Sequence, residues 1–243
     1  MKKVWYAPNR LEAYGEEEIK AVEESLRAGW LAGFGPRTIE FEEKIAKEFG
    51  KKFGVFVNSG SSACLLALAA LDLPKGSKIL TPALTFSTTL APIVQLGYTP
   101  VFIDSNLTSY VPDVEDIIDA ITDDIKAIMV PNLIGNKPNW KKLKDELFNI
   151  NRSDIYLIED SADTVTYTKE SDVSTTSFYA SHVITAGGMG GMVMFNDEKH
   201  VKRALMYRDW GRIGDNSENM SKRFAHDVDG IPYDYKFLYG FHH

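Results

Sequence analysis

The chain has 243 residues, a formal net charge of −7 and one cysteine, Cys64. Its 44% hydrophobic and 25% charged residues are ordinary for a soluble globular protein, and the acidic balance argues against nucleic-acid binding through a basic surface. A single cysteine builds neither a disulfide framework nor a cysteine-based metal site within one chain. The N-terminus lacks an apolar signal core and no stretch approaches about 18 apolar residues, so we expect a cytoplasmic enzyme without a membrane partner.

Two helices are predicted before the first strand. Apolar residues recur at helical intervals within Glu16–Ala28, and Gly29 is typical of a helix end. An aromatic and glycine-rich segment, Trp30–Gly35, follows. Pro36 then begins a second helix that ends at Gly50, because proline suits the first helical position.

From residue 53 onward, predicted strands alternate with predicted helices. The strands are Phe53–Val57, Lys78–Leu80, Pro100–Ile103, Ile125–Val130 and Ile155–Ile158, and the helices between them are Ser62–Leu71, Thr85–Leu96, Asp113–Ile121 and Trp140–Phe148. Such alternation implies right-handed crossovers onto one sheet. The sequence therefore predicts an α/β fold with a mostly parallel central sheet and helices on both faces.

Beyond Asp160 the pattern changes to short strands around a glycine cluster, Gly187–Gly191. The strands predicted there are Ser177–Tyr179, His182–Thr185 and Met192–Phe195. A helix over Asp197–Met206 follows, whereas the polar stretch Arg212–Asp229 fits no regular element.

Four features fall at the carboxyl ends of predicted strands, where ligands of open parallel sheets collect. The first is Asn58-Ser59-Gly60-Ser61-Ser62, which enters a helix. Free amides and hydroxyls at a helix start suit a phosphate, but Ser59 or Ser61 could equally be an ordinary N-cap.

The other three features are single polar or aromatic groups with an alternative structural role. Phe86 could stack on a planar ring, although a lone phenylalanine at a helix start more often belongs to the core. Asp160 could hold a protonated ring nitrogen, bind a metal or cap a turn. His182, before the glycine cluster, more often would be a packed or surface histidine than a catalyst. We assign no metal role to the terminal His242 and His243.

Taken in order, these pieces resemble the DegT/DnrJ/EryC1/StrS sugar aminotransferase/dehydratase family of fold-type-I pyridoxal phosphate enzymes. The stretches that carry the resemblance run roughly from Gly29 to Arg212 and read WLAGFGPRTIEFEEKIAKEFG, VNSGSSACLLALAAL, TPALTFSTTLAPIVQLGYTPVFID, IEDSADT and SFYASHVITAGGMGG. Their shared order is far more specific than any one motif. The resemblance implies a large cofactor-binding domain over residues 35–243, preceded by an N-terminal helix and arm over residues 1–34.

The resemblance also implies roles for individual residues. Gly60, Ser61 and Ser177 would contact the phosphate of the cofactor, Phe86 would stack on its ring, and Asp160 would pair with the ring nitrogen. Asp163, in the IEDSADT motif, would join the cofactor-binding set. In the aminotransferase branch, a lysine that bonds covalently to pyridoxal phosphate stands at the position of His182.

Histidine at this position resembles the sugar 3-dehydratase branch, which uses pyridoxamine phosphate. The implied reaction removes the hydroxyl on carbon 3 of a nucleotide-linked 4-keto-6-deoxyhexose, in deoxysugar or surface-polysaccharide biosynthesis, with His182 as the base that moves the proton. Two alternatives are a pyridoxal-phosphate-dependent nucleotide-sugar aminotransferase and a non-catalytic, degenerate family member.

The resemblance further implies a homodimer with a nucleotide-sugar substrate. An iron–sulfur cluster is not expected, because the stretch after Arg208–Arg212 has no cysteine. Met189, Cys64 and Thr166 depart from the family pattern, which usually has glutamate, asparagine (in the dehydratases) and glycine there. The family continues past the position of Tyr239 into a smaller C-terminal domain, so we expect the large domain to be incomplete and the small one missing.

Overall fold

A computed structural model describes residues 14–29, 35–209, 211, 226–228 and 231–233. Most of the segment Trp30–Gly35 and residues 212–225 of the predicted irregular stretch lie outside the described residues, as do Tyr239, His242 and His243. The division of the chain at residues 34 and 35 stays a prediction.

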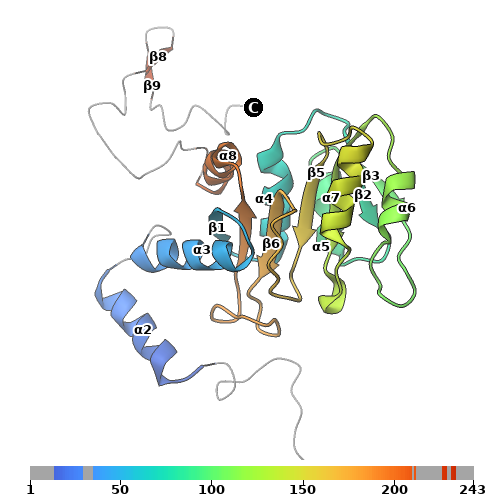
Figure 1. The fold of residues 1–243 in the computed structure, drawn as a ribbon. Coiled ribbons are helices and arrows are strands. Elements are labelled where there is room, and N and C mark those ends of the chain that lie inside the picture. Colours follow the sequence, from blue (N-terminus) through green and yellow to red (C-terminus); the bar gives the residue numbers. More distant parts are fainter. Residues whose placement is uncertain (1–13, 30–34, 210, 212–225, 229–230, 234–243) are drawn as a thin grey trace, which may run out of the picture.

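A seven-stranded sheet forms the centre of the fold (Figure 1). Its strands are β1 (Phe53–Val57), β2 (Lys78–Pro82), β3 (Thr99–Ile103), β4 (Ile125–Pro131), β5 (Tyr156–Asp160), β6 (Val173–Ser177) and β7 (Gly191–Phe195). They lie in the order β1-β7-β6-β5-β4-β2-β3, and only β7 runs antiparallel to its neighbours. The predicted α/β fold with a mostly parallel sheet is therefore confirmed.

Helices cover both faces of this sheet (Figure 1). They are α3 (Pro36–Glu48), α4 (Gly60–Leu71), α5 (Ser87–Gln95), α6 (Val114–Asp119), α7 (Trp140–Asn149) and α8 (Glu198–Arg208); the chain also forms a helix α2 (Glu16–Arg27) and a short 3-10 turn at Leu133–Gly135. One apolar core joins the sheet to α4, α5 and α8, while a second joins its other face to α6 and α7. A smaller cluster packs α3 against β7.

Successive residues of a strand point into the two cores alternately, because side chains alternate across a strand. Ala127 and Met129 of β4 face α4 and α5, whereas Ile128 and Val130 face α6 and α7. The same alternation at the end of β5 sends two acidic side chains into different layers.

Two predictions about the region after β5 are wrong. The strand expected at Ser177–Tyr179 lies earlier, at Val173–Ser177, since the hydroxyl side chains of that segment find buried partners. The strand expected at His182–Thr185 is instead a turn and bends. Thr185 Oγ1 donates to the carbonyl of Phe178 (3.0 Å) and accepts from the amide of Gly188 (3.1 Å), and these bonds fold the segment back on itself.

Helix α2 stands apart from the sheet (Figure 1) and buries none of its residues. Its apolar side chains Ile19, Val22 and Leu26 are exposed. The short strands β8 (His226–Val228) and β9 (Ile231–Tyr233) form a separate antiparallel pair. Among the described helices, none is both long and apolar enough to cross a membrane.

Candidate functional site

The start of α4 lies at the carboxyl end of β1. Ser59 adopts an extended backbone there, and its Oγ accepts the amide of Ser62 at 3.1 Å, so the N-cap interpretation of Ser59 is confirmed. The cap satisfies one of the free amides of the first turn and leaves those of Gly60 and Ser61 without a partner inside the helix. A helix start with free amides is an anion-binding feature.

The start of α4 also abuts the end of β6. A Cβ placed on Gly60 would lie 2.7 Å from the Cβ of Ser177, so only glycine permits this approach. A Cβ on Gly191 would lie 2.3 Å from the carbonyl carbon of Ser59. The structure therefore brings Gly60 and Ser177 together, with Ser61 next to them on the same turn.

Asp160 ends β5 on the face covered by α4 and α5. Its side chain is buried, with the residue 7% exposed. Each carboxylate oxygen accepts a hydrogen bond from a threonine hydroxyl. Thr89 Oγ1 on α5 donates to Oδ2 at 2.8 Å, and Thr175 Oγ1 on β6 donates to Oδ1 at 3.2 Å. Burial raises the pKa of Asp160 above its ordinary value, and these hydrogen bonds oppose that rise.

Phe86 precedes α5 and presents its ring to the surface. The residue is 68% exposed, so its interpretation as a core side chain is wrong. Its carbonyl accepts the amide of Thr89 at 3.0 Å, which ties it to the turn that carries the hydroxyl bonded to Asp160. An exposed ring at this edge is free to stack on a planar group.

His182 and Asp163 approach each other from the loops that follow β6 and β5. Nε2 of His182 lies 3.9 Å from Oδ1 of Asp163, and the imidazole side chain is 22% exposed. Asp163 Oδ2 accepts the backbone amide of Ile134 at 3.3 Å, and the ring of Tyr179 contacts the imidazole edge-on. The ring atom Nδ1 of His182 is buried and has no hydrogen-bond partner among the described residues.

Glu159 points to the opposite face of the sheet from Asp160, and no pattern in the sequence predicts its environment. It is fully buried, and Asn132 Nδ2 donates to its Oε1 at 2.6 Å. Four hydroxyls also donate to its carboxylate, from Thr166, Thr168, Ser171 and Ser174. Lys51 lies nearby; burial lowers its pKa to about 8, and the charge of Glu159 opposes that drop.

Because five donors converge on Glu159, Glu159→Leu is expected to destabilise the fold by about 3 to 5 kcal/mol, leaving several buried groups unpaired at once. Urea unfolding should show a lower midpoint with an unchanged slope. The matched control is Glu198→Leu on the surface, where the ion pair with Lys202 is exposed and the loss should be about 1 kcal/mol or less. Equal losses in both variants would contradict a structural role for this network.

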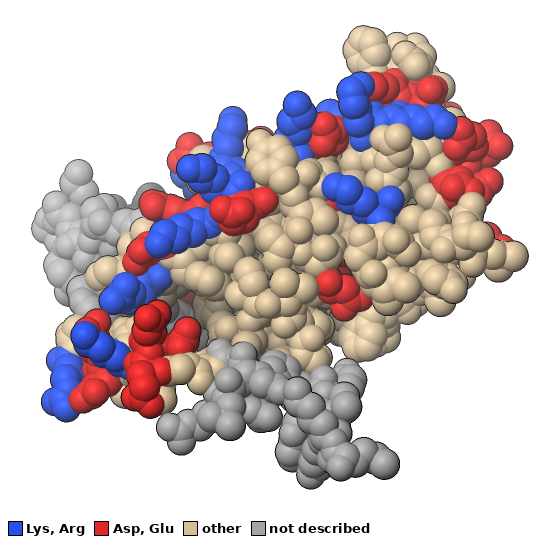
Figure 2. Space-filling view, turned by 60° about the horizontal axis from the view of Figure 1, so that its bottom comes forward, with Lys and Arg blue, Asp and Glu red and all other residues tan. Residues whose placement is uncertain are grey.

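The surface at the carboxyl edge is poor in charge. Figure 2, which brings the bottom of the Figure 1 view forward, shows a broad area with few charged side chains. Loops at this edge expose large apolar residues, namely Phe86, Ile134, Tyr179, Val183 and Met189. Contiguous exposed apolar surface is typical of a face that meets another protein or a ligand.

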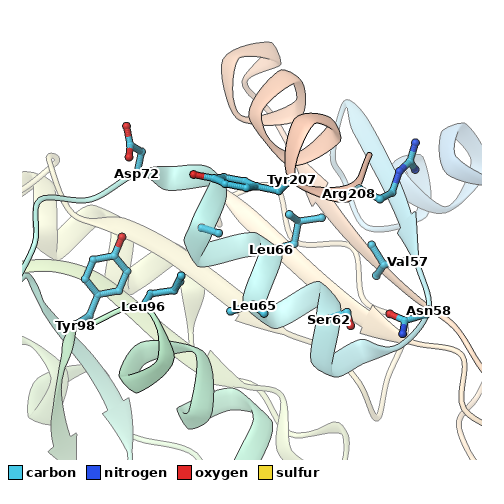
Figure 3. Close-up of a pocket in the computed structure, with 11 residues that line it drawn as sticks. Val57, Asn58, Ser62, Leu65, Leu66, Asp72, Leu96, Tyr98, Tyr207 and Arg208 are labelled. Atoms are coloured by element: carbon cyan, nitrogen blue, oxygen red, sulfur yellow. The ribbon is translucent and has the colours of Figure 1, made fainter. Parts of the chain in front are cut away.

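A separate cavity of about 610 Å³ lies along the outer side of α4. In Figure 3, Leu65 and Leu66 of α4 form its floor between Tyr207 of α8 and Tyr98 on the opposite side. Ser62 closes one end, but none of the predicted site residues lines it. The candidate site therefore does not depend on this cavity. Within the described residues, no group of three or more His, Cys, Asp or Glu side chains is placed to hold a metal ion.

Comparison with known proteins gives consistent matches over most of the chain. The lipopolysaccharide biosynthesis protein RfbH of Salmonella typhimurium is 34% identical over 93% of this chain and 55% of its own length. The GDP-4-keto-6-deoxy-D-mannose 3-dehydratase of Escherichia coli O55:H7 is 33% identical over 80% of this chain and 53% of its own. The chain thus spans about half the length of these curated relatives.

A solved structure agrees with the sequence matches. The E. coli GDP-4-keto-6-deoxy-D-mannose-3-dehydratase with bound hydrated PLP superposes with a TM-score of 0.73 at 30% identity, covering 85% of this chain and 54% of that one. The family model for the DegT/DnrJ/EryC1/StrS aminotransferases matches residues 12–237. This chain therefore belongs to the DegT/DnrJ/EryC1/StrS aminotransferase family.

Proposed function

We propose that this chain is the cofactor-binding part of a pyridoxamine- or pyridoxal-phosphate-dependent 3-dehydratase. Its substrate would be a nucleotide-linked 4-keto-6-deoxyhexose, in the biosynthesis of a deoxysugar or surface polysaccharide. The observation that carries the proposal is the imidazole of His182, which stands near Asp163 at the carboxyl edge where a lysine would be needed for covalent attachment of the cofactor. The similarity to a 3-dehydratase in sequence and in fold supports it.

The residues at the edge of the sheet fit a phosphorylated pyridine cofactor. The free amides of Gly60 and Ser61, beside Ser177, suit the phosphate. The buried carboxylate of Asp160 suits a protonated ring nitrogen, and the exposed ring of Phe86 suits stacking. We propose these roles, together with a cofactor contact by Asp163, for the bound state.

When bound, the cofactor would supply an electron sink for proton removal. The carboxylate of Asp160 would stabilise the protonated form of the ring nitrogen, because a buried group stays ionised more readily beside an opposite charge. His182 accepts and returns the proton, since imidazole moves protons near neutral pH. Asp163, 3.9 Å from Nε2, helps to orient the imidazole.

The main alternative is amino transfer, which the description of the family itself names. His182 argues against it because imidazole does not form the stable covalent bond to the cofactor that lysine forms. A non-catalytic role, suggested by Met189 where the family usually has glutamate, is the third hypothesis.

We also propose that the enzyme acts as a homodimer in the cytoplasm and needs no iron–sulfur cluster. The charge-poor surface at the carboxyl edge supports a second copy as the partner, because the exposed apolar side chains there surround the candidate site.

The test is incubation of the protein with pyridoxamine phosphate and a panel of GDP- and dTDP-linked 4-keto-6-deoxyhexoses, followed by mass spectrometry. A product that has lost one oxygen from the sugar supports the dehydratase. A product in which an amine replaces the keto oxygen would show amino transfer instead, and no binding of either cofactor form by titration would favour the non-catalytic reading.

A further inference from the structure

We propose that Cys64, Thr175 and Thr89 form a hydrogen-bonding relay that keeps the carboxylate of Asp160 ionised and correctly turned before any cofactor binds. The three are positioning residues, and the inference rests on the proposed function only for its consequence in cofactor binding.

The first step is the geometry around Asp160. Thr89 and Thr175 approach from different elements, α5 and β6, and each donates to a different carboxylate oxygen, at 2.8 and 3.2 Å. Two donors on two oxygens fix the plane of the carboxylate. An ionised carboxylate offers about four acceptor sites, and hydrogen bonds from the Cys64 thiol and the backbone amide of Ala162 also lower the pKa of Asp160.

The second step is the direction of the hydrogen bonds. A hydroxyl has one hydrogen, and that of Thr175 is committed to Asp160, so its oxygen is left to accept. Sγ of Cys64 lies 3.4 Å from Thr175 Oγ1 and is completely buried in α4. The thiol hydrogen is therefore available to Thr175 and to the neighbouring carboxylate of Asp160, and its hydrogen bonding lowers the pKa of that carboxyl.

The third step is the charge state of the two ends. Burial and the neighbouring carboxylate raise the pKa of Cys64 well above its ordinary value, so the thiol keeps its proton and remains a donor. Burial pushes the pKa of Asp160 upward, and hydrogen bonds to the ionised form act against that push. The relay thus favours the ionised form of Asp160, which burial disfavours.

The experiment compares Thr89→Val and Thr175→Val with a matched control, Thr176→Val. Thr176 lies on the same strand and is equally buried, but its hydroxyl donates to the carbonyl of Ser161 at 3.0 Å rather than to Asp160. The first readout is the infrared carboxyl band of Asp160 followed against pH in cofactor-free protein, with Asp160→Asn as the subtraction reference.

Each of the first two variants is expected to increase the proton affinity of Asp160 about tenfold, because a hydrogen bond to a charged group is lost. Thr176→Val should leave it unchanged. Cys64→Ala should also increase it, but by less, because a thiol is a weaker hydrogen-bond donor than a hydroxyl. Thr175→Ser should restore the wild-type titration.

The second readout is titration with pyridoxamine phosphate and with an analogue that carries C–H in place of the ring nitrogen. Thr89→Val and Thr175→Val should weaken binding of the first about tenfold and leave binding of the second unchanged. If circular dichroism shows that Thr175→Val does not fold, the same two measurements are made on Thr89→Val and Cys64→Ala instead.

An Asp160 titration in Thr89→Val and Thr175→Val identical to that in Thr176→Val would overturn the relay, whatever the cofactor does. A shifted titration in a protein that binds neither compound would support the relay and overturn the proposed function. The two failures are therefore separable.

Discussion

Asp160→Asn is expected to lower kcat/KM for the proposed dehydration by at least about 10²- to 10³-fold, the range seen when one electrostatic partner of a developing charge is removed. The amide carries no charge to stabilise a protonated ring nitrogen, and the ring would then accept electrons poorly. Steady-state kinetics measure the loss, and the absorbance of bound cofactor reports the state of the ring.

The matched control is Asp154→Asn. This aspartate lies just before the amino end of β5, is exposed, and forms ion pairs with Arg152 and Lys126. Its loss should leave kcat/KM unchanged, since exposed pairs contribute little. Wild-type activity and spectrum in Asp160→Asn would contradict a ring-nitrogen contact.

His182→Asn is expected to reduce the dehydration rate by about 10²- to 10⁴-fold, the range for general acid–base catalysis, while cofactor binding persists. Asparagine keeps a similar shape but cannot accept the proton. Single-turnover measurement with bound pyridoxamine phosphate isolates this step from substrate binding.

A second substitution at this position tests the choice of reaction. His182→Lys places an amine beside the same loop, and it should let borohydride trap pyridoxal phosphate on the chain, as wild type should not. A wild-type chain that is trapped as efficiently would contradict the dehydratase proposal and favour amino transfer through another lysine.

The sequence predicted the parallel sheet well because its strands and helices carry local apolar patterns that suffice to identify them. Strand β6 has no such pattern. Its Ser174 and Thr175 are fully buried because they donate to Glu159 and Asp160, which precede them by fifteen residues each, and no local window contains both partners. The sequence therefore predicts a strand too late, at Ser177–Tyr179 instead of Val173–Ser177.

The candidate site was predictable only as a set of residues on one edge. A lone phenylalanine at a helix start is ordinarily a core residue, yet the turn before α5 leaves Phe86 exposed, as stacking on a ring requires. Thr89 looks like any helix residue in the sequence, and its contact with Asp160 appears only when α5 packs on β5. Two adjacent acids followed by a segment rich in serine and threonine could have indicated that Thr175 bonds to one of those acids.

The position of β7 has a consequence for how the protein assembles. Among the described strands, β1 is at the border of the sheet and pairs with β7 alone, from Phe53 with Phe195 to Val57 with Gly191. Contacts so distant in sequence close late in folding, because a long loop must first be ordered. β1 therefore gains this partner strand only after residue 195 has been synthesised, and the serine-glycine turn that follows β1 meets Ser177 and Gly191 equally late.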